Sequence, residues 1–425
     1  MEGLLIVVFV LGYLAITLEH PLKIDKAASA MITGVLCWTI YVTAATDYHE
    51  VVHNLEAHLG EISGILFFLL GAMTIVELID AHDGFEILTD RIKTTEKRRL
   101  LWLVCFITFF LSAALDNLTT TIVMISLVRK LIADRNDRIF FAGLIVVAAN
   151  AGGAWSPLGD VTTTMLWIGG QITVLNIITM LLIPSLICLL APLLLIAPKM
   201  TGHVQTPERT GASDIISPAR ERNIVFGLGL GSLLFVPVFK TLTHLPPFMG
   251  MLLGLGVMWV VTELIHSEKD EREKGPLSVL HALRKIDTPS ILFFLGILMA
   301  VAALQSTGLL SALAGWLDRT IQNTTLIVLI IGFLSAIVDN VPLVAAAQGM
   351  YSLEQFPVDN YFWEFLAYCT GTGGSALIIG SAAGVAAMGI ENIRFGWYLR
   401  RITIWAVLGY LAGAAAYVLQ YNLLH

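Results

Sequence analysis

Long apolar runs separated by short polar segments dominate this chain. Ten of the runs have about the length of a transmembrane helix, since roughly 20 helical residues cross about 30 Å of hydrocarbon. They predict spans at residues 3–18, 29–45, 61–79, 139–168, 172–197, 223–240, 247–265, 289–306, 361–390 and 399–420. The pattern therefore predicts an all-α polytopic membrane protein.

Two further apolar segments, 100–128 and 323–350, do not fit as simple spans. Each has about 28 residues, or ~42 Å of helix, which is too long for an untilted crossing. Basic residues flank the first segment on both sides, and a single crossing would place one group on the wrong side of the membrane. We therefore expect a re-entrant hairpin whose tip, at 112–117, lies near the midplane. The second segment is followed by an acidic stretch without Lys or Arg, so it is expected to enter from the opposite side.

The distribution of basic residues supports this topology. With ten crossings and two hairpins, both termini are predicted to lie outside, and 23 of the 25 Lys and Arg residues fall on the inner side. This is the asymmetry that the positive-inside rule requires. The segment 47–61, which contains three histidines, is expected to be a solvated outer loop.

Similar motifs occur in the two halves of the chain. LSAALDNLTTTIVM, GILFFLLGAM and NAGGAWSPLGDVTTTM correspond to LSAIVDNVPLVAAA, SILFFLGILM and GTGGSALIIGSAAGVAAM. The halves start on opposite sides of the membrane, which predicts two inverted repeats, 1–197 and 223–425, joined by a cytoplasmic linker at 198–222. Each repeat is expected to hold one hairpin and one transmembrane helix broken at small or cyclic residues, which are Gly152, Gly153, Pro157, Gly159, Gly373 and Gly374.

Composition agrees with a membrane location and adds little else. Of 425 residues, 56% are hydrophobic and 13% are charged, whereas soluble domains carry about 25% charged residues. The mean hydropathy is +0.80. The four cysteines lie in apolar runs at unrelated spacings, so neither a disulfide framework nor a zinc site is predicted.

Polar residues gather around the predicted hairpin tips and helix breaks. They offer carboxylate, amide and hydroxyl oxygens without Cys or His, which suits a hard cation. An Asp at membrane depth costs about 2.5–3.5 kcal/mol, and no Lys or Arg is expected in the apolar core as a counter-ion. Protons and a metal cation would then compete for these carboxylates, because burial and like-charged neighbours favour the neutral form. We expect the cation to bind at Asp116, Asp160 and Asp339, and the resemblance described below implies that this cation is Na⁺.

Other interpretations of these residues stay open. Asn117, Asn340 and Asp160 are also good helix caps, and the threonines at 162–164 are typical of helix packing. An intramembrane aspartyl protease would need Tyr and Gly where the chain has Leu115 and Pro157. A passive channel is a further alternative, but opposed hairpins around a closed site favour alternating access. We therefore expect a transporter without a cofactor and not an enzyme.

At these motifs the sequence resembles the NhaD-type sodium/proton antiporters of the ion transporter superfamily. The resemblance is most specific in LDNLTTTIVM, ANAGGAWSPLGDVTTTMLW and DNVPLVAAA. It implies exchange of Na⁺ or Li⁺ for H⁺ by a homodimer in the lipid bilayer, in a bacterial inner membrane, with no nucleic acid partner. The implied functional residues are Asp116, Asn117, Asn150, Asp160, Thr162, Thr163, Ser335, Asp339, Asn340 and Ser375.

The alternative within the same superfamily is an anion, dicarboxylate or metalloid carrier. Dicarboxylate members have Ser-Asn-Thr at the hairpin tips, whereas this chain has Asp116 and Asp339 in place of the serines. A carboxylate in place of a hydroxyl attracts cations and repels anions, so the substitution favours a cation site.

Overall fold

The computed structural model of the chain describes residues 2–89, 92, 94–205, 207 and 218–424. These residues are helical apart from their connections, and the β contact among them is one isolated bridge between Glu96 and His203. The all-α prediction is therefore confirmed. Part of the predicted linker 198–222 lies outside the described residues.

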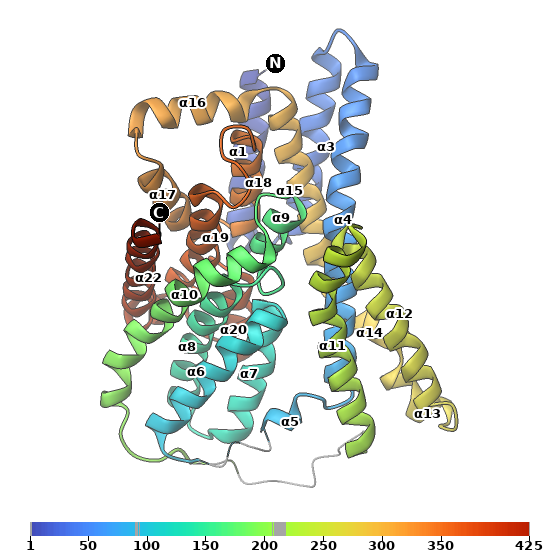
Figure 1. Cartoon of the computed structure of the whole chain (residues 1–425), viewed down its shortest axis with the longest axis vertical. Helices are drawn as coiled ribbons and strands as arrows, with labels where there is room; N and C mark the ends of the chain where they lie inside the picture. Colours follow the sequence, from blue (N-terminus) through green and yellow to red (C-terminus); the bar gives the residue numbers. More distant parts are fainter. Residues whose placement is uncertain (1, 90–91, 93, 206, 208–217, 425) are drawn as a thin grey trace.

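The helices are of three kinds (Figure 1). Long unbroken helices are α1 (Glu2–Thr17), α3 (Lys26–Ala44), α4 (Tyr48–Ala81), α10 (Val174–Ile196), α11 (Ala219–Thr243), α12 (Pro247–Ile265), α15 (Thr288–Ser306) and α22 (Thr403–Leu424). Helices at breaks or sharp bends are α6 (Lys97–Ala114), α7 (Asn117–Leu131), α8 (Arg135–Gly153), α9 (Val161–Ile168), α16 (Leu309–Ile321), α17 (Thr324–Leu334), α18 (Asn340–Met350), α19 (Tyr361–Gly373) and α20 (Ala382–Glu391). Short connecting helices are α2 (Glu19–Leu22), α5 (Glu86–Thr89), α13 (Glu271–Lys274), α14 (Val279–Lys285) and α21 (Phe395–Arg401).

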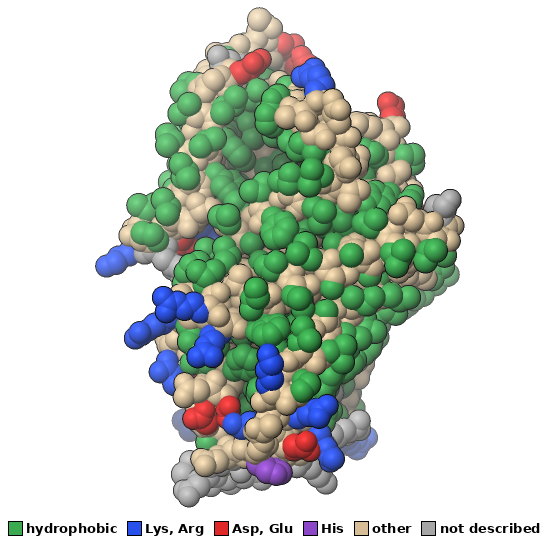
Figure 2. Space-filling view, turned by 90° about the vertical axis from the view of Figure 1, so that its left-hand side faces the viewer, with side chains coloured by type: hydrophobic (Ala, Val, Ile, Leu, Met, Phe, Trp, Pro, Cys, Tyr) green, Lys and Arg blue, Asp and Glu red, His purple; other side chains and the backbone are tan. Residues whose placement is uncertain are grey.

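Seven helices in the described part of the chain are long and apolar enough to cross a membrane, or eight if the bent pair α16–α17 counts as one span. The seven are α3, α4, α10, α11, α12, α15 and α22. The three other predicted spans are α1, which has 16 residues, and the two that are divided into α8–α9 and α19–α20. A polytopic membrane protein is thus confirmed. Figure 2 shows a broad hydrophobic band with Lys and Arg gathered toward the lower end.

One local prediction was wrong, and one helix was not predicted. The segment 47–61 is not a loop, because α4 runs unbroken through 34 residues from Tyr48. Asp47 caps this helix by accepting a hydrogen bond from the backbone N–H of His49 at 2.8 Å, which satisfies one orphan donor of the first turn. The chain also forms α16, an amphipathic helix that was not predicted and that bends by 118° into α17.

Each predicted hairpin appears as two helices with a break between them. The α6–α7 pair breaks at residues 115–116, and both of its outer ends lie at the lower end of the molecule (Figure 1). There Lys97, at the start of α6, forms an ion pair of 2.6 Å with Asp137, just beyond α7. The α17–α18 pair breaks at residues 335–339 and lies in the upper half. Both pairs are therefore broken at the predicted tips, and their re-entrant course in the membrane stays a prediction.

The two broken helices pack against these pairs through equivalent glycines. A Cβ on Gly152 of α8 would lie 2.1 Å from the carbonyl oxygen of Phe109 on α6. A Cβ on Gly373 of α19 would lie 2.1 Å from the carbonyl oxygen of Gly332 on α17. Because real Cβ atoms do not approach backbone oxygen this closely, glycine is required at both positions. The close packing sets each helix break directly beside a hairpin tip.

The helices α3, α4, α11, α12 and α15 pack beside the hairpins and broken helices (Figure 1). Among them α3 and α15 are in backbone contact. A Cβ on Gly34 would lie 2.6 Å from the carbonyl oxygen of Gly296, and one on Gly296 would lie 2.4 Å from the amide nitrogen of Met31. This interdigitated packing leaves the pair little room to slide.

Candidate cation site

Asp160 lies at the centre of the candidate site, at the start of the half-helix α9. Its side chain is almost fully buried, with 1% of the residue exposed. The Oδ1 atom accepts hydrogen bonds from the backbone N–H of Thr162 at 2.8 Å and from the Thr162 hydroxyl at 2.7 Å. The carboxylate therefore caps the positive end of α9, which stabilises negative charge at this position.

Both hairpin tips reach this carboxylate. The Nδ2 atom of Asn117, on the first hairpin, donates to Asp160 Oδ2 at 2.7 Å. The Nδ2 atom of Asn340, on the second hairpin, lies 3.4 and 3.5 Å from the two carboxylate oxygens. Segments 43 and 180 positions away in the sequence thus converge on one charged group.

A chain of amides and hydroxyls extends this network to the second helix break. Asn117 Nδ2 also donates to Asn150 Oδ1 at 3.0 Å. Asn150 Nδ2 in turn donates to the hydroxyls of Ser375 and Ser381, both at 2.9 Å. All of these groups are buried. The predicted residues Asn117, Asn150, Asp160, Asn340 and Ser375 therefore lie together, and Ser381, the N-cap of α20, joins them.

The other predicted residues have separate local roles. Asp116 caps α7, accepting from the backbone N–H and the hydroxyl of Thr119 at 2.7 and 2.6 Å. Asp339 caps α18 through the N–H of Val341 at 3.3 Å. The Ser335 hydroxyl donates to the carbonyl oxygens of Gly332 and Thr370 and so joins α17 to α19. Within the described ranges, no three His, Cys, Asp or Glu side chains gather as a metal cluster.

Lys26 is a site residue that the sequence did not reveal. Its Nζ atom lies 3.2 Å from Asp339 Oδ2 and 4.4 Å from the centroid of the Phe293 ring. The prediction that no basic side chain reaches the polar core is therefore wrong. The reason is tertiary, because Lys26 lies between the predicted spans 3–18 and 29–45 and its partner is 313 positions away.

Several threonine hydroxyls beside the site have no hydrogen-bond partner in the described part of the chain. They belong to Thr163 on α9 and to Thr120 and Thr121 on α7, and all three residues are fully buried. A buried hydroxyl without a partner is costly. By contrast, Thr164 donates to the carbonyl oxygen of Pro157 at 2.7 Å and so bridges the helix break. Hydroxyl oxygens are ligands that a small hard cation accepts, and of these three residues Thr163 lies on the same half-helix as Asp160.

The charged groups face a small cavity. Its volume is about 70 Å³, and its charged lining side chains are Lys26, Asp116, Asp160 and Asp339. A cavity of this size has room for an ion together with water molecules. Its other polar lining residues are Asn117, Asn340, Thr164 and Ser290.

Three cavities follow one another along a single face of α4. A cavity of about 420 Å³ lies toward α16, the central cavity follows, and a third of about 70 Å³ lies toward α5. From α4 they are lined by His58, Ile62 and Ile65, then by Leu69, Met73 and Val76, and then by Asp80. Residues spaced by three and four share a helix face, so one face of α4 forms a wall common to all three cavities.

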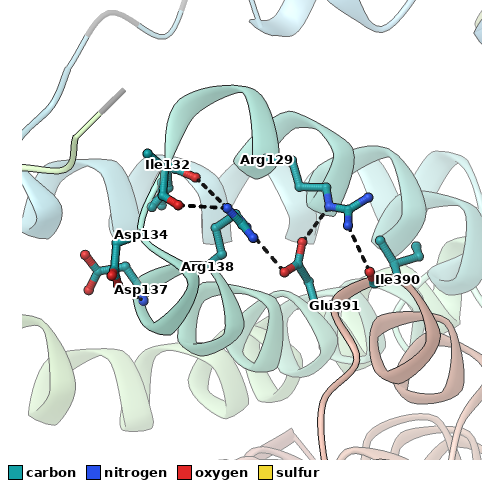
Figure 3. A network of polar contacts seen from close by, with 8 residues as sticks. Arg129, Ile132, Asp134, Asp137, Arg138, Ile390 and Glu391 are labelled. Carbon is teal, nitrogen blue, oxygen red and sulfur yellow. Dashed lines mark hydrogen bonds and ion pairs between the residues drawn. The ribbon is translucent and has the colours of Figure 1, made fainter. Parts of the chain in front are cut away.

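The lower ends of the site helices are tied together by Glu391, which terminates α20 (Figure 3). Its side chain is 2% exposed and pairs with Arg129 of α7 at 2.8 Å and with Arg138 of α8 at 3.3 Å. Arg129 also donates to the carbonyl oxygen of Ile390 at 3.1 Å. Because a buried carboxylate is costly unless it is paired, this network fixes α7, α8 and α20 relative to one another.

These features define a class of protein. Paired half-helices that present a buried carboxylate and amides to a central cavity are typical of multi-pass membrane transporters and not of enzymes. The sequence profile of the citrate transporter family, CitMHS, matches residues 5–363, so the chain belongs to this family.

Similarity to individual proteins places the chain more precisely within this family. The chain is 50% identical to sodium/proton antiporter 1 of Arabidopsis thaliana, over 98% of this chain and 72% of that protein. It is 47% identical to sodium/proton antiporter 2 of the same plant, over 97% and 98%. The Na⁺/H⁺ antiporter NhaD of Alkalimonas amylolytica is 30% identical over 99% and 91%. The chain is thus a member of the family that includes the NhaD-type antiporters, as its motifs indicated.

Proposed function

We propose that this protein exchanges Na⁺, or Li⁺, for H⁺ across the membrane and that both ions bind at Asp160. The observation that carries the proposal is the convergence of both hairpin tips on this one buried carboxylate. The relatives named as sodium/proton antiporters support the same substrates.

The chemistry of exchange follows from a single negative charge among neutral oxygens. Na⁺ would be held by the carboxylate together with hydroxyls such as those of Thr162 and Thr163, and by the amide oxygens of Asn150 and Asn340. A proton on Asp160 removes the charge that attracts the cation, so one ion excludes the other. Asp116 and Asp339 add negative potential to the cavity and raise the local cation concentration.

Access to the site alternates between the two sides of the membrane in this proposal. The two halves, 1–197 and 223–425, act as inverted repeats whose hairpins enter from opposite sides, with both termini outside. The cavities along α4 provide the approaches, and apolar side chains such as Ile65 and Phe68 close the outer one from the site. Because the relatives come from a plant and from bacteria, the bacterial inner membrane stays a prediction, as does the homodimer.

A carboxylate anion, to which the family name points, fits this site less well. Three aspartates line the cavity, and the ammonium group of Lys26 is already paired with one of them. An anion placed there would face uncompensated negative charge at close range.

The test is Na⁺-driven proton movement in vesicles that contain the purified protein and a ΔpH-sensitive dye. Asp160→Asn should abolish the signal, since it removes the shared charge. Asp47→Asn, at the exposed cap of α4, should leave it intact because asparagine caps equally well. Normal exchange in the Asp160→Asn variant, or a response to citrate in place of Na⁺, would overturn the proposal.

A further inference from the structure

Lys26 occupies a position that its own helix disfavours. It is the first residue of α3, directly after the N-cap Asp25, whose side chain accepts from the N–H of Ala27 at 2.8 Å. The helix dipole is positive at this end and opposes a cation. The lysine side chain is also only 25% exposed. An ammonium group is stable here because Asp339 and the ring of Phe293 surround it.

The two partners of Lys26 belong to different parts of the molecule. Phe293 lies on α15, which is locked to α3 by the backbone contact between Gly34 and Gly296. Lys26 is therefore anchored in the α3–α15 pair. Asp339 instead lies at the tip of the second hairpin, and the next residue, Asn340, reaches Asp160. The ion pair is thus a direct link between the α3–α15 pair and a tip that contacts the cation site.

Few charged groups line the central cavity beside this link. The described lining of the central cavity carries one positive group, Lys26, and three carboxylates, on Asp116, Asp160 and Asp339. A cation that enters beside Asp160 repels the ammonium group and attracts the same Asp339 carboxylate. The ammonium group and the transported cation therefore compete for one carboxylate, that of Asp339.

From this geometry we propose that Lys26 is a tethered competitor of the transported cation. It holds Asp339 and the second hairpin tip when the site carries no cation, and an arriving cation draws Asp339 away from it. Lys26 is thus a positioning residue that weakens cation binding and returns the tip after release. This inference rests on the proposed function and adds a residue to it.

The test compares Lys26→Gln with Lys26→Arg and with Lys23→Gln. Lys23 is an exposed lysine three residues earlier and serves as the matched control. Lys26→Gln should lower the apparent KM for Na⁺ by about two- to fivefold, the range for a partly exposed ion pair. It should also lower kcat for Na⁺/H⁺ exchange, because Asp339 at the second hairpin tip is no longer held by an ion pair when the site carries no cation. Lys26→Arg keeps the charge and should stay near the wild-type KM, and Lys23→Gln should match wild type throughout.

If Lys26 only stabilised the fold, the Lys26→Gln variant would show a different pattern, with kcat reduced and the KM for Na⁺ unchanged or raised. Either that pattern or a wild-type KM in Lys26→Gln overturns the proposal. The loss of kcat should vanish in an Asp339→Asn background, where Lys26 has no carboxylate to hold. The double variant buries no lone charge, so it decides the question if the single variant fails to fold: a kcat clearly below that of Asp339→Asn alone refutes the proposed action of Lys26 through Asp339.

The failure of this inference is distinguishable from the failure of the proposed function. Wild type and Asp160→Asn are measured in the same vesicles. If wild type moves no protons in response to Na⁺, the proposed function is wrong. If wild type exchanges and Lys26→Gln behaves identically, only the competition is wrong.

Discussion

The hydroxyl of Thr163 offers a test in which stability and transport should change in opposite directions. Thr163 is fully buried in the first turn of α9, three residues after Asp160, and its Oγ1 atom has no partner in the described structure. Thr163→Val replaces this hydroxyl with a methyl group and keeps the branched shape. The substitution therefore removes one oxygen and creates no cavity.

The expected magnitudes follow from the cost of an unsatisfied polar group, about 1–3 kcal/mol. Without Na⁺, the wild-type protein bears this cost, so Thr163→Val should melt at the same temperature or higher. With Na⁺, the wild-type hydroxyl gains a ligand that valine lacks. The apparent KM for Na⁺ should then rise by about 5- to 150-fold, the equivalent of 1–3 kcal/mol.

The assay combines thermal unfolding in detergent, with and without Na⁺, and exchange kinetics in vesicles. Thr163→Ser restores the oxygen and should restore the KM. Ser185→Ala is the matched control, because Ser185 is also fully buried with an unpartnered hydroxyl but belongs to α10 and not to the half-helix α9 that Asp160 caps. It should leave the KM unchanged. An unchanged KM in Thr163→Val, together with a lower melting temperature, would refute the assignment and make α9 a packing element.

Three further predictions concern packing, pH and topology. Gly152→Ala should destabilise the protein by about 1–3 kcal/mol or more and abolish transport, because its Cβ meets the backbone oxygen of Phe109; Gly3→Ala, which meets nothing within 4 Å, is the control for melting and exchange. Burial lowers the pKa of His266, just beyond α12 and stacked on His82 at 5.1 Å, from 6.5 to about 4. As the pH falls, the unfolded chain protonates His266 before the folded protein does, so the contribution of this residue to folding stability should be complete above pH 6.5 and be lost toward pH 4. In the His266→Gln variant the melting temperature should depend less on pH between these two values. Cysteines at 133 and 355, in a variant without native cysteines, should react with impermeant reagents from opposite faces, and labelling from one face would contradict the opposed hairpins.

The class of fold and the segments of the site could be predicted from the sequence because they depend on local patterns. Twenty-residue apolar runs identify membrane helices in any packing arrangement. The Asp-Asn pairs at the tips stand out because charged residues are rare in apolar helices, and the first break stands out because three glycines and a proline fall within residues 152–159. Asn117, Asn150 and Asp160 were therefore identified as site residues before the structure showed them in hydrogen-bond contact.

The division of roles among the aspartates needed the tertiary structure. Asp116, Asp160 and Asp339 look alike in sequence, since each precedes a helix in apolar surroundings. Only packing decides that Asp160 meets both hairpin tips, that Asp116 bonds its own helix and that Asp339 pairs with Lys26. Electrostatic partners are set by distance in space, and residues 313 positions apart leave no trace of their contact in local periodicity. The sequence by itself thus determined which segments are helical, broken and polar, and the tertiary structure decided which of their charges meet.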